Sequence, residues 1–242
     1  MKPAFRVLIS ASVIVLLSGC YAVQKSDSYY GVKTVDQNVV FVLDRSGSME
    51  GKDEGIAGVA VQSQVLNRSA DVAQDKVGGF LGNLIGGQIR SEGTKMGAAK
   101  RALIPAVRGL ETPSRYAVVT FGGQVDTWHG QMTPATASSK NVDIVRINQV
   151  SAEGGTPMLT ALQRGFQYPD ATVIFLLTDG QPTDSNNADI LARVAALNST
   201  RRVVIHTIGF GDDKDTAFLR RLAQDNGGQY IDQTNAGNWL PF

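Results

Sequence analysis

Short apolar runs alternate with segments of helical periodicity along most of the chain. Residues 39–43 form a continuous β-favouring run, which is typical of a strand buried on both faces. The pattern predicts further strands at 115–121, 124–128, 172–178, 203–208 and 229–232, with 124–128 at an edge. It predicts helices from Lys95 to about 110, at 142–150, at 158–166, and around 190–197 and 218–222, the last closed by Gly227.

Strands that alternate with helices predict a mainly parallel sheet. We therefore expect an α/β fold of three layers, in which helices cover both faces of a doubly wound sheet with one antiparallel edge strand. Ligands bind such sheets beyond the carboxyl ends of the strands. The loops that leave those ends are therefore the expected place of a binding site.

Length and charge narrow the class of protein. The 242 residues suit one α/β domain with additions, and 23 Lys and Arg residues balance 22 Asp and Glu residues. Binding to phosphate backbones needs a concentrated basic face, so the near-neutral charge argues against a nucleic-acid partner. The sequence does not indicate an oligomeric state.

The first twenty residues have the pattern of a processing signal. Lys2 and Arg6 precede a short apolar run at 7–17, which suits a secretory signal better than a membrane span. The following Leu17-Ser18-Gly19-Cys20 resembles the bacterial lipobox, and Cys20 is the only cysteine of the chain. The alternatives are an ordinary signal peptide with a chance cysteine, or a signal anchor.

The lipobox resemblance implies that residues 1–19 are removed and that Cys20 carries the lipid. Residues 20–37 would then tether the domain to the membrane, facing the periplasm of a bacterial cell envelope. In enterobacterial-type sorting an Asp after the cysteine retains a lipoprotein at the inner membrane. Tyr21 stands there in this chain, which favours the outer membrane.

Three loops at predicted strand ends or helix starts carry oxygen-bearing side chains. They are Asp44-Arg45-Ser46-Gly47-Ser48, Gly154-Gly155-Thr156-Pro157 and Thr178-Asp179-Gly180. Hard oxygen ligands with few carboxylates suit Mg²⁺ or Mn²⁺ rather than zinc or copper. The alternative is structural, because Asp, Ser and Thr also cap helices and satisfy backbone donors in turns.

Taken together, these loops resemble the metal-ion-dependent adhesion site of von Willebrand factor A (vWA) domains, which have a Rossmann-like fold. The family pattern is Asp-x-Ser-x-Ser, a distant Thr and an Asp in a Thr-Asp-Gly turn. It falls here on Asp44, Ser46, Ser48, Thr156 and Asp179. The resemblance runs from Asn38 to about Asp232 and implies a bound Mg²⁺ or Mn²⁺. It also implies that a partner protein offers an Asp or Glu carboxylate to that ion.

An insertion separates the first loop from the helix that begins at Lys95. It covers about residues 51–94 within a vWA domain of residues 38–242, and Gly78, Gly82 and Gly86 recur in it at every fourth position. Such spacing permits close helix contact. The insertion is either a loop or helical hairpin packed on its own domain, or an element that contacts a partner or the membrane.

Two other classes compete with a binding module. A metal-dependent hydrolase would use Asp44 and Asp179 to hold Mg²⁺, but Ser46 lacks the surroundings of a hydrolase nucleophile. An envelope scaffold would use the metal only to stabilise its fold. Of the two histidines, His206 is predicted to lie in the core and His129 to face solvent, so neither suits catalysis. We expect a protein without enzymatic activity.

Overall fold

The computed structural model describes residues 28–29, 32–33, 37–52 and 93–233. The predicted signal peptide, Cys20 and most of the predicted insertion lie outside these residues. No helix within the described ranges is long and apolar enough to cross a membrane.

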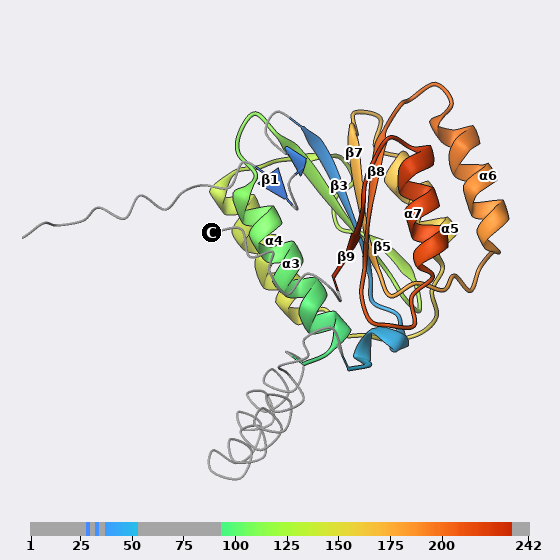
Figure 1. Cartoon of the computed structure of the whole chain (residues 1–242). Coiled ribbons are helices and arrows are strands. Elements are labelled where there is room, and N and C mark those ends of the chain that lie inside the picture. The colour runs from blue at the N-terminus through green and yellow to red at the C-terminus, as the bar shows by residue number, and fades with distance from the viewer. Residues whose placement is uncertain (1–27, 30–31, 34–36, 53–92, 234–242) are drawn as a thin grey trace, which may run out of the picture.

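A mainly parallel sheet forms the centre of the domain (Figure 1). Its path is β5-β4-β3-β7-β8-β9, in which β5 is antiparallel to β4 and the other neighbours are parallel. The strands are β3 (Asn38–Asp44), β4 (Arg115–Phe121), β5 (Val125–Thr127), β7 (Val173–Thr178), β8 (Val204–Gly209) and β9 (Tyr230–Asp232). The short β6 (Thr133–Pro134) also pairs antiparallel with β4. The predicted doubly wound α/β class is confirmed.

Helices cover both faces of the sheet (Figure 1). They are α3 (Lys95–Gly109), α4 (Ala137–Gln149), α5 (Met158–Phe166), α6 (Asn187–Asn198) and α7 (Thr216–Asp225), with the 3-10 turn η1 (Gly47–Glu50) after β3. One core joins α3 and α4 to alternate residues of β3, Val39, Phe41 and Leu43. The intervening Val40 and Val42 join the core beneath α5, α6 and α7. Because successive side chains of a strand point to opposite faces, one apolar run serves both cores.

Two segments differ from their predictions. Helix α4 begins at Ala137 rather than near Val142, because Thr136 and Ser139 form a reciprocal capping box that starts it earlier. Its exposed Val142 and Val145 blur the apolar face that marks most helices. Within the predicted tether, β1 (Ser28–Tyr29) pairs with β2 (Val32–Lys33), and strands of two residues are too short to give a periodic signal.

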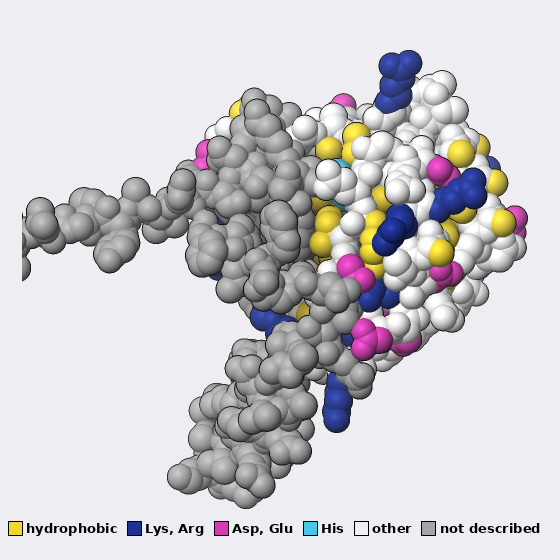
Figure 2. All heavy atoms as spheres, in the orientation of Figure 1, with side chains coloured by type: hydrophobic (Ala, Val, Ile, Leu, Met, Phe, Trp, Pro, Cys, Tyr) yellow, Lys and Arg dark blue, Asp and Glu magenta, His cyan; other side chains and the backbone are white. Residues whose placement is uncertain are grey.

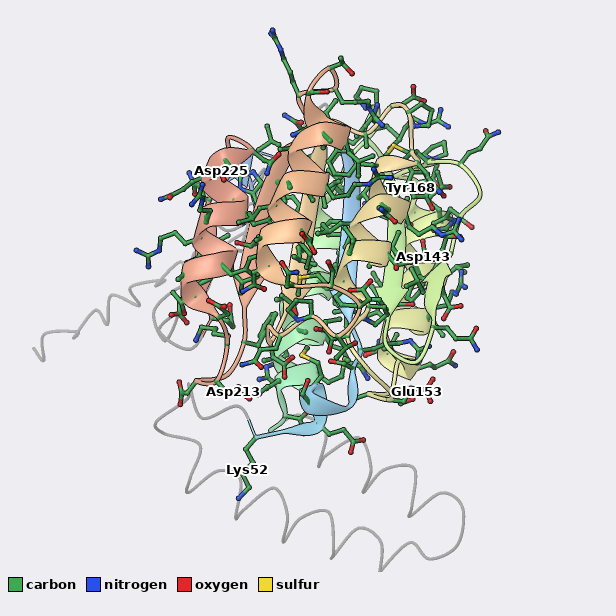
Figure 3. All side chains as sticks on the ribbon, turned by 90° about the vertical axis from the view of Figure 1, so that its right-hand side faces the viewer. Lys52, Asp143, Glu153, Tyr168, Asp213 and Asp225 are labelled. Atoms are coloured by element: carbon green, nitrogen blue, oxygen red, sulfur yellow. The ribbon has the colours of Figure 1, made fainter. Side chains whose placement is uncertain are left out.

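The carboxyl ends of the parallel strands lie together along the lower edge in Figure 1. In the space-filling view of the same side, acidic and basic side chains are interspersed over the described surface, and several acidic ones lie near that edge (Figure 2). Figure 3 places Lys52, Glu153 and Asp213 at this end of the molecule. This end therefore brings together the loops that the sequence analysis singled out.

Candidate metal centre

The carboxyl ends of β3 and β7 are adjacent in the middle of the sheet. Asp44 is the last residue of β3, and Asp179 follows directly after β7. From β3 the chain passes through α3 to β4 on one side, whereas from β7 it passes through α6 to β8 on the other. The order of the strands therefore reverses between β3 and β7, and we call this place the reversal point. The loops that leave the two strands diverge there, and sheets of this kind bind ligands in the crevice between such loops.

Hydrogen bonds connect four of the five predicted ligands. The backbone N–H of Ser46 donates to Asp44 Oδ1 at 2.8 Å, and the hydroxyls of Ser46 and Ser48 are 3.0 Å apart. The Ser48 hydroxyl donates to Asp179 Oδ1 at 3.0 Å, although the two residues are 131 positions apart in the chain. Asp44, Ser46, Ser48 and Asp179 therefore form one compact group of oxygen donors.

Thr156 reaches this group through its loop. The N–H of Gly47 donates to the carbonyl of Gly154 at 2.9 Å, which joins the first and second loops. The N–H of Thr156 donates to the Thr183 hydroxyl at 2.9 Å, and Thr156 is only 5% exposed. Main-chain atoms thus hold the Thr156 loop against the Ser46–Ser48 turn.

Glycines permit this close approach of the loops. Gly154 has a φ of +73°, and a Cβ there would lie 2.3 Å from the backbone of Gly123. A Cβ on Gly122 would lie 2.6 Å from the carbonyl oxygen of Glu153. The sequence analysis missed Gly122 and Gly123. Their signal is a pair of glycines directly after a core strand, where a loop must pass close to another backbone.

Arg45 fastens the outer side of the same loops. Its guanidinium contacts Glu153 at 2.5 Å and Asp126 at 3.2 Å. Its side chain is 13% exposed, whereas the two carboxylates are mostly exposed. Arg45 therefore ties the β3 loop to the loop before Thr156 and to the edge strand β5, while its neighbours Asp44 and Ser46 point inward.

The electrostatics of Asp44 suit a cation site. Burial raises the pKa of Asp44 to about 6, hydrogen bonds from Ser46 and Thr178 lower it, and the nearby charge of Asp179 raises it. The Thr178 hydroxyl donates to Asp44 Oδ2 at 2.5 Å. The described residues thus contact Asp44 with hydroxyls and a backbone N–H. A cation beside this carboxylate would lower the free energy of its charged form.

The donor set fits a small, hard divalent ion. It consists of two carboxylates and three hydroxyl side chains, the ligand chemistry of Mg²⁺ or Mn²⁺. The described ranges contain no group of three or more His, Cys, Asp or Glu side chains placed to hold a metal ion. Two carboxylates alone would not fill the coordination of a divalent ion, so the neighbouring hydroxyls and water would have to complete it, and the site carries few negative charges.

The family model of the von Willebrand factor type A domain matches residues 87–232. This chain belongs to that family. The matched residues include Thr156 and Asp179, whereas Asp44, Ser46 and Ser48 precede them. The structure joins both parts, because β3 lies between β4 and β7 in the sheet of the vWA domain.

Curated relatives include the heavy chains of inter-alpha-trypsin inhibitor. Heavy chain H4 of Homo sapiens is 27% identical over 212 residues, which cover 82% of this chain and 18% of the relative. Heavy chain H1 of Mesocricetus auratus is 29% identical over 152 residues, covering 57% and 16%. The chain therefore spans less than a fifth of the length of these relatives.

Solved structures share the fold of this vWA domain. The von Willebrand factor type A protein from Catenulispora acidiphila superposes with a TM-score of 0.58 at 23% identity, covering 81% of this chain and 38% of that one. The conserved hypothetical protein BatB from Bacteroides thetaiotaomicron gives 0.53 at 13% identity, covering 81% and 89%. Domains of this family typically mediate protein–protein interactions and commonly bind a divalent metal.

Lys95 lies beside the candidate ligands, and the sequence analysis missed it. We predicted it only as the start of a helix, yet its Nζ lies 3.1 Å from Asp179 Oδ2 and 2.6 Å from Asp213 Oδ1. Burial lowers its pKa, but the hydrogen bonds and charges of Asp213 and Asp179 outweigh burial and raise it. A buried lysine beside a predicted metal ligand has no signature in sequence spacing.

The two histidines of the vWA domain lie outside the site. His206 is 5% exposed, and its Nδ1 accepts a hydrogen bond from the N–H of Gln229 at 3.0 Å, as expected for a core residue. The prediction that His129 faces solvent is wrong, because its side chain is 19% exposed and its Nε2 lies 2.8 Å from Asp143. Asp143 lies in the predicted helix, but the sequence pattern did not show that this helix brings it against His129.

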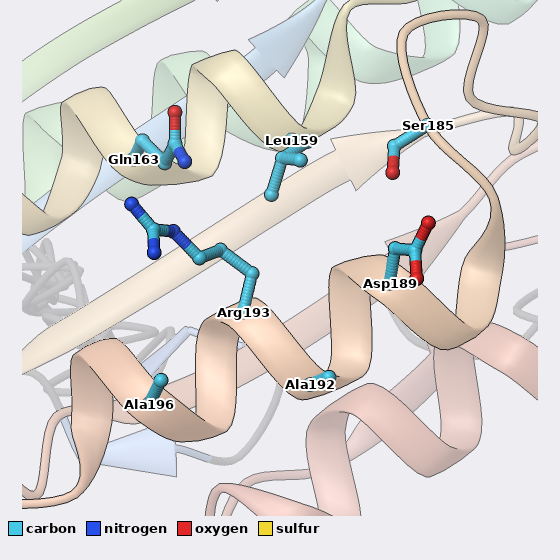
Figure 4. A pocket seen from close by; sticks show the side chains of 7 residues that line it. All are labelled: Leu159, Gln163, Ser185, Asp189, Ala192, Arg193 and Ala196. Atoms are coloured by element: carbon cyan, nitrogen blue, oxygen red, sulfur yellow. The ribbon is translucent and has the colours of Figure 1, made fainter.

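A surface hollow between α5 and α6 does not coincide with the candidate ligands (Figure 4). Leu159 and Gln163 line it from α5, and Asp189, Ala192, Arg193 and Ala196 from α6, with Ser185 at one end. None of the predicted metal ligands contributes to it.

Proposed function

We propose that this vWA domain binds a partner protein through a divalent cation held by Asp44, Ser46, Ser48, Thr156 and Asp179. The observation that carries the proposal is the hydrogen-bonded group of oxygen donors between the ends of β3 and β7, in which Ser48 is exposed and the other donors are buried. When bound, the ion would supply an electrophilic position for an Asp or Glu carboxylate of the partner. Mg²⁺ and Mn²⁺ fit the donors best.

The chain's own residues would orient and shield this site. Asp44 is fixed by Ser46 and Thr178, while Ser48 holds Asp179 Oδ1. Ser48 is exposed whereas Ser46 is 1% exposed, so the donors present one open side to a partner. A largely pre-formed set of ligands lowers the cost of ordering side chains on binding.

We propose a binding module rather than an enzyme. Both histidines of the chain are engaged elsewhere, one with Asp143 and one with the backbone of Gln229. General acid–base catalysis in proteins uses histidine most often, and its absence from the site favours recognition. A hydrolase would turn over a small substrate without a protein partner, and a scaffold would keep its partners after chelation.

Calorimetry tests the cation site directly. We expect the detergent-solubilised protein to bind Mg²⁺ or Mn²⁺ saturably, and Ser46→Ala to weaken binding at least about tenfold because a buried ligand oxygen is lost. Ser185→Ala, a serine of the α5–α6 hollow, is the matched control and should bind as the unaltered protein does. Equal affinity in all three would contradict the proposed ligands.

Partner capture tests the recognition step. Envelope proteins retained with Mg²⁺ and released by chelator would identify partners, and replacing the partner's critical Asp or Glu by its amide should abolish retention. Retention that survives chelation would favour the scaffold instead.

We also propose that Cys20 anchors the chain to the bacterial envelope, in accord with the lipobox resemblance. The unaltered protein should carry fatty acid and fractionate with the membrane, and we expect the outer membrane. Cys20→Ser should lose the fatty acid and move to the soluble fraction. Unchanged fractionation would point to a signal anchor.

A further inference from the structure

Lys95 links the candidate site to the neighbouring loops of the sheet edge. It is the first residue of α3, and its side chain is only 7% exposed. Its ammonium group donates to Asp179, after β7, and to Asp213, after β8. The ammonium group of α3, which follows β3, thus contacts carboxylates that follow β7 and β8 on the other side of the reversal point.

The fold is shaped to hold this side chain. Gly211 has a φ of +73°, and a Cβ there would lie 2.3 Å from Lys95 Cε. The N–H of Lys95 donates to the Gly51 carbonyl at 3.0 Å, which fixes the start of the helix beside the end of η1. The glycine at position 211 thus leaves room for the end of the lysine side chain next to Asp213.

Asp179 divides its two oxygens between different partners. Oδ1 accepts from the Ser48 hydroxyl, within the group of candidate ligands, and Oδ2 accepts from Lys95. The lysine thereby fixes the carboxylate plane and offsets one of the two buried negative charges, Asp44 and Asp179. Removing it would leave these two carboxylates without that positive charge beside them.

We propose that Lys95 is an internal counter-ion of the cation site, which orients Asp179 and holds the affinity for the divalent ion down. This inference rests on the proposed function. The ammonium repels a divalent ion and withdraws Asp179 Oδ2 from it, so the ion is held less tightly and stays more electrophilic toward a partner carboxylate. Lys95 is a positioning residue, because it acts through Asp179.

Titration of the Lys95→Met protein with Mg²⁺ and Mn²⁺ by calorimetry tests the proposal. Methionine keeps the length of the stem and removes the charge. We expect cation affinity to rise roughly tenfold or more. The melting temperature without added metal should fall, because Asp179 loses its buried partner, and should recover when metal is added.

Asp213→Asn removes a negative charge beside the ammonium, whereas Lys95→Met removes the ammonium itself. The Asp213 side chain is mostly exposed, so we expect this variant to fold. Losing Asp213 leaves the ammonium to Asp179 alone, so cation affinity should fall several-fold. Glu153→Gln is the matched control, since Glu153 is a similarly exposed carboxylate of the same edge (62% against 68%) that Arg45 holds instead. Its effect should be smaller than that of Asp213→Asn.

The outcomes separate the two proposals. No cation binding by the unaltered protein would overturn the proposed function and this inference together. Cation binding by the unaltered protein, with equal or weaker binding by Lys95→Met, would overturn the counter-ion role alone. If Lys95→Met fails to fold, equal effects of Asp213→Asn and Glu153→Gln would overturn it as well.

Discussion

Among the described residues, two aspartates are wholly buried, and their surroundings are opposite. Asp44 and Asp143 are both 0% exposed. Asp143 Oδ2 lies 2.6 Å from the Tyr116 hydroxyl and 2.8 Å from His129 Nε2, with Arg146 3.8 Å from Oδ1. Asp44 instead meets hydroxyls and a backbone N–H. One carboxylate has basic side chains around it and the other does not.

The pKa of each aspartate follows from these neighbours. Burial raises the pKa of Asp143. The hydrogen bonds of His129 and Tyr116 and the charges of His129 and Arg146 lower it by more, so the pKa is lowered overall. Burial dominates at Asp44, for a net increase. A carboxylate whose counter-charge comes from the chain stabilises the fold, whereas one without it is suited to receive an ion.

The largest expected effect is the loss of stability in Asp143→Asn. Its neutral amide loses the two charge-assisted contacts that the buried carboxylate makes with Tyr116 and His129, each worth about 1.5–3 kcal/mol. Denaturant unfolding should show this loss, while calorimetry should show unchanged cation affinity. Weaker cation binding in the folded variant would mean that the two aspartates are not independent.

Asp44→Asn should have the reverse profile. Neutralising a ligand should reduce cation affinity about a hundredfold, or about 2.7 kcal/mol. Stability without metal should be kept or rise, because the folded state disfavours the charge that this substitution removes. Calorimetry and unfolding on the same preparation would check both results. A strongly destabilised protein would place Asp44 with Asp143, as a structural residue.

The sequence was sufficient to predict the strands and to place the loops with the candidate ligands at one edge of the sheet. Buried strands such as β3 and β7 are continuous apolar runs, and polar residues at their carboxyl ends meet wherever parallel strands are neighbours. The partners of buried charges could not be predicted. His129 and Asp143 meet because α4 packs near β4, and Lys95 meets Asp179 across 84 positions, so neither pair follows from spacing.

The buried His206 makes the stability of the domain depend on pH, independently of the two aspartates. Burial lowers its pKa from 6.5 to about 4, so the unfolded chain binds more protons between these values. Its contribution to stability is complete above pH 6.5 and is lost as the pH falls toward 4, by about 2 kcal/mol at pH 4.5. Asp44, with a raised pKa, acts in the opposite direction over part of this range.

The difference between the unaltered protein and His206→Asn isolates the histidine. The asparagine Oδ1 can take the place of Nδ1 and accept the Gln229 N–H without gaining a proton, so the variant's free energy of unfolding should fall less between pH 7 and 4.5. Parallel pH profiles would contradict the assigned pKa decrease.

The smallest expected effect comes from a substitution at the start of α4. It shows whether a loss of stability away from the candidate site changes cation affinity. The Thr136 side chain accepts from the Ser139 N–H, and the Ser139 side chain returns the contact to the Thr136 N–H. Thr136→Ala should cost about 1 kcal/mol, because this cap is lost, and Thr136→Ser should restore it. Neither should change cation affinity. If Thr136→Ala weakened cation binding, a loss of stability in α4 alone would change the candidate site, through the loop that follows α4 and carries Thr156. The effects of Asp44→Asn and Asp143→Asn on cation affinity could then not be separated from their effects on stability.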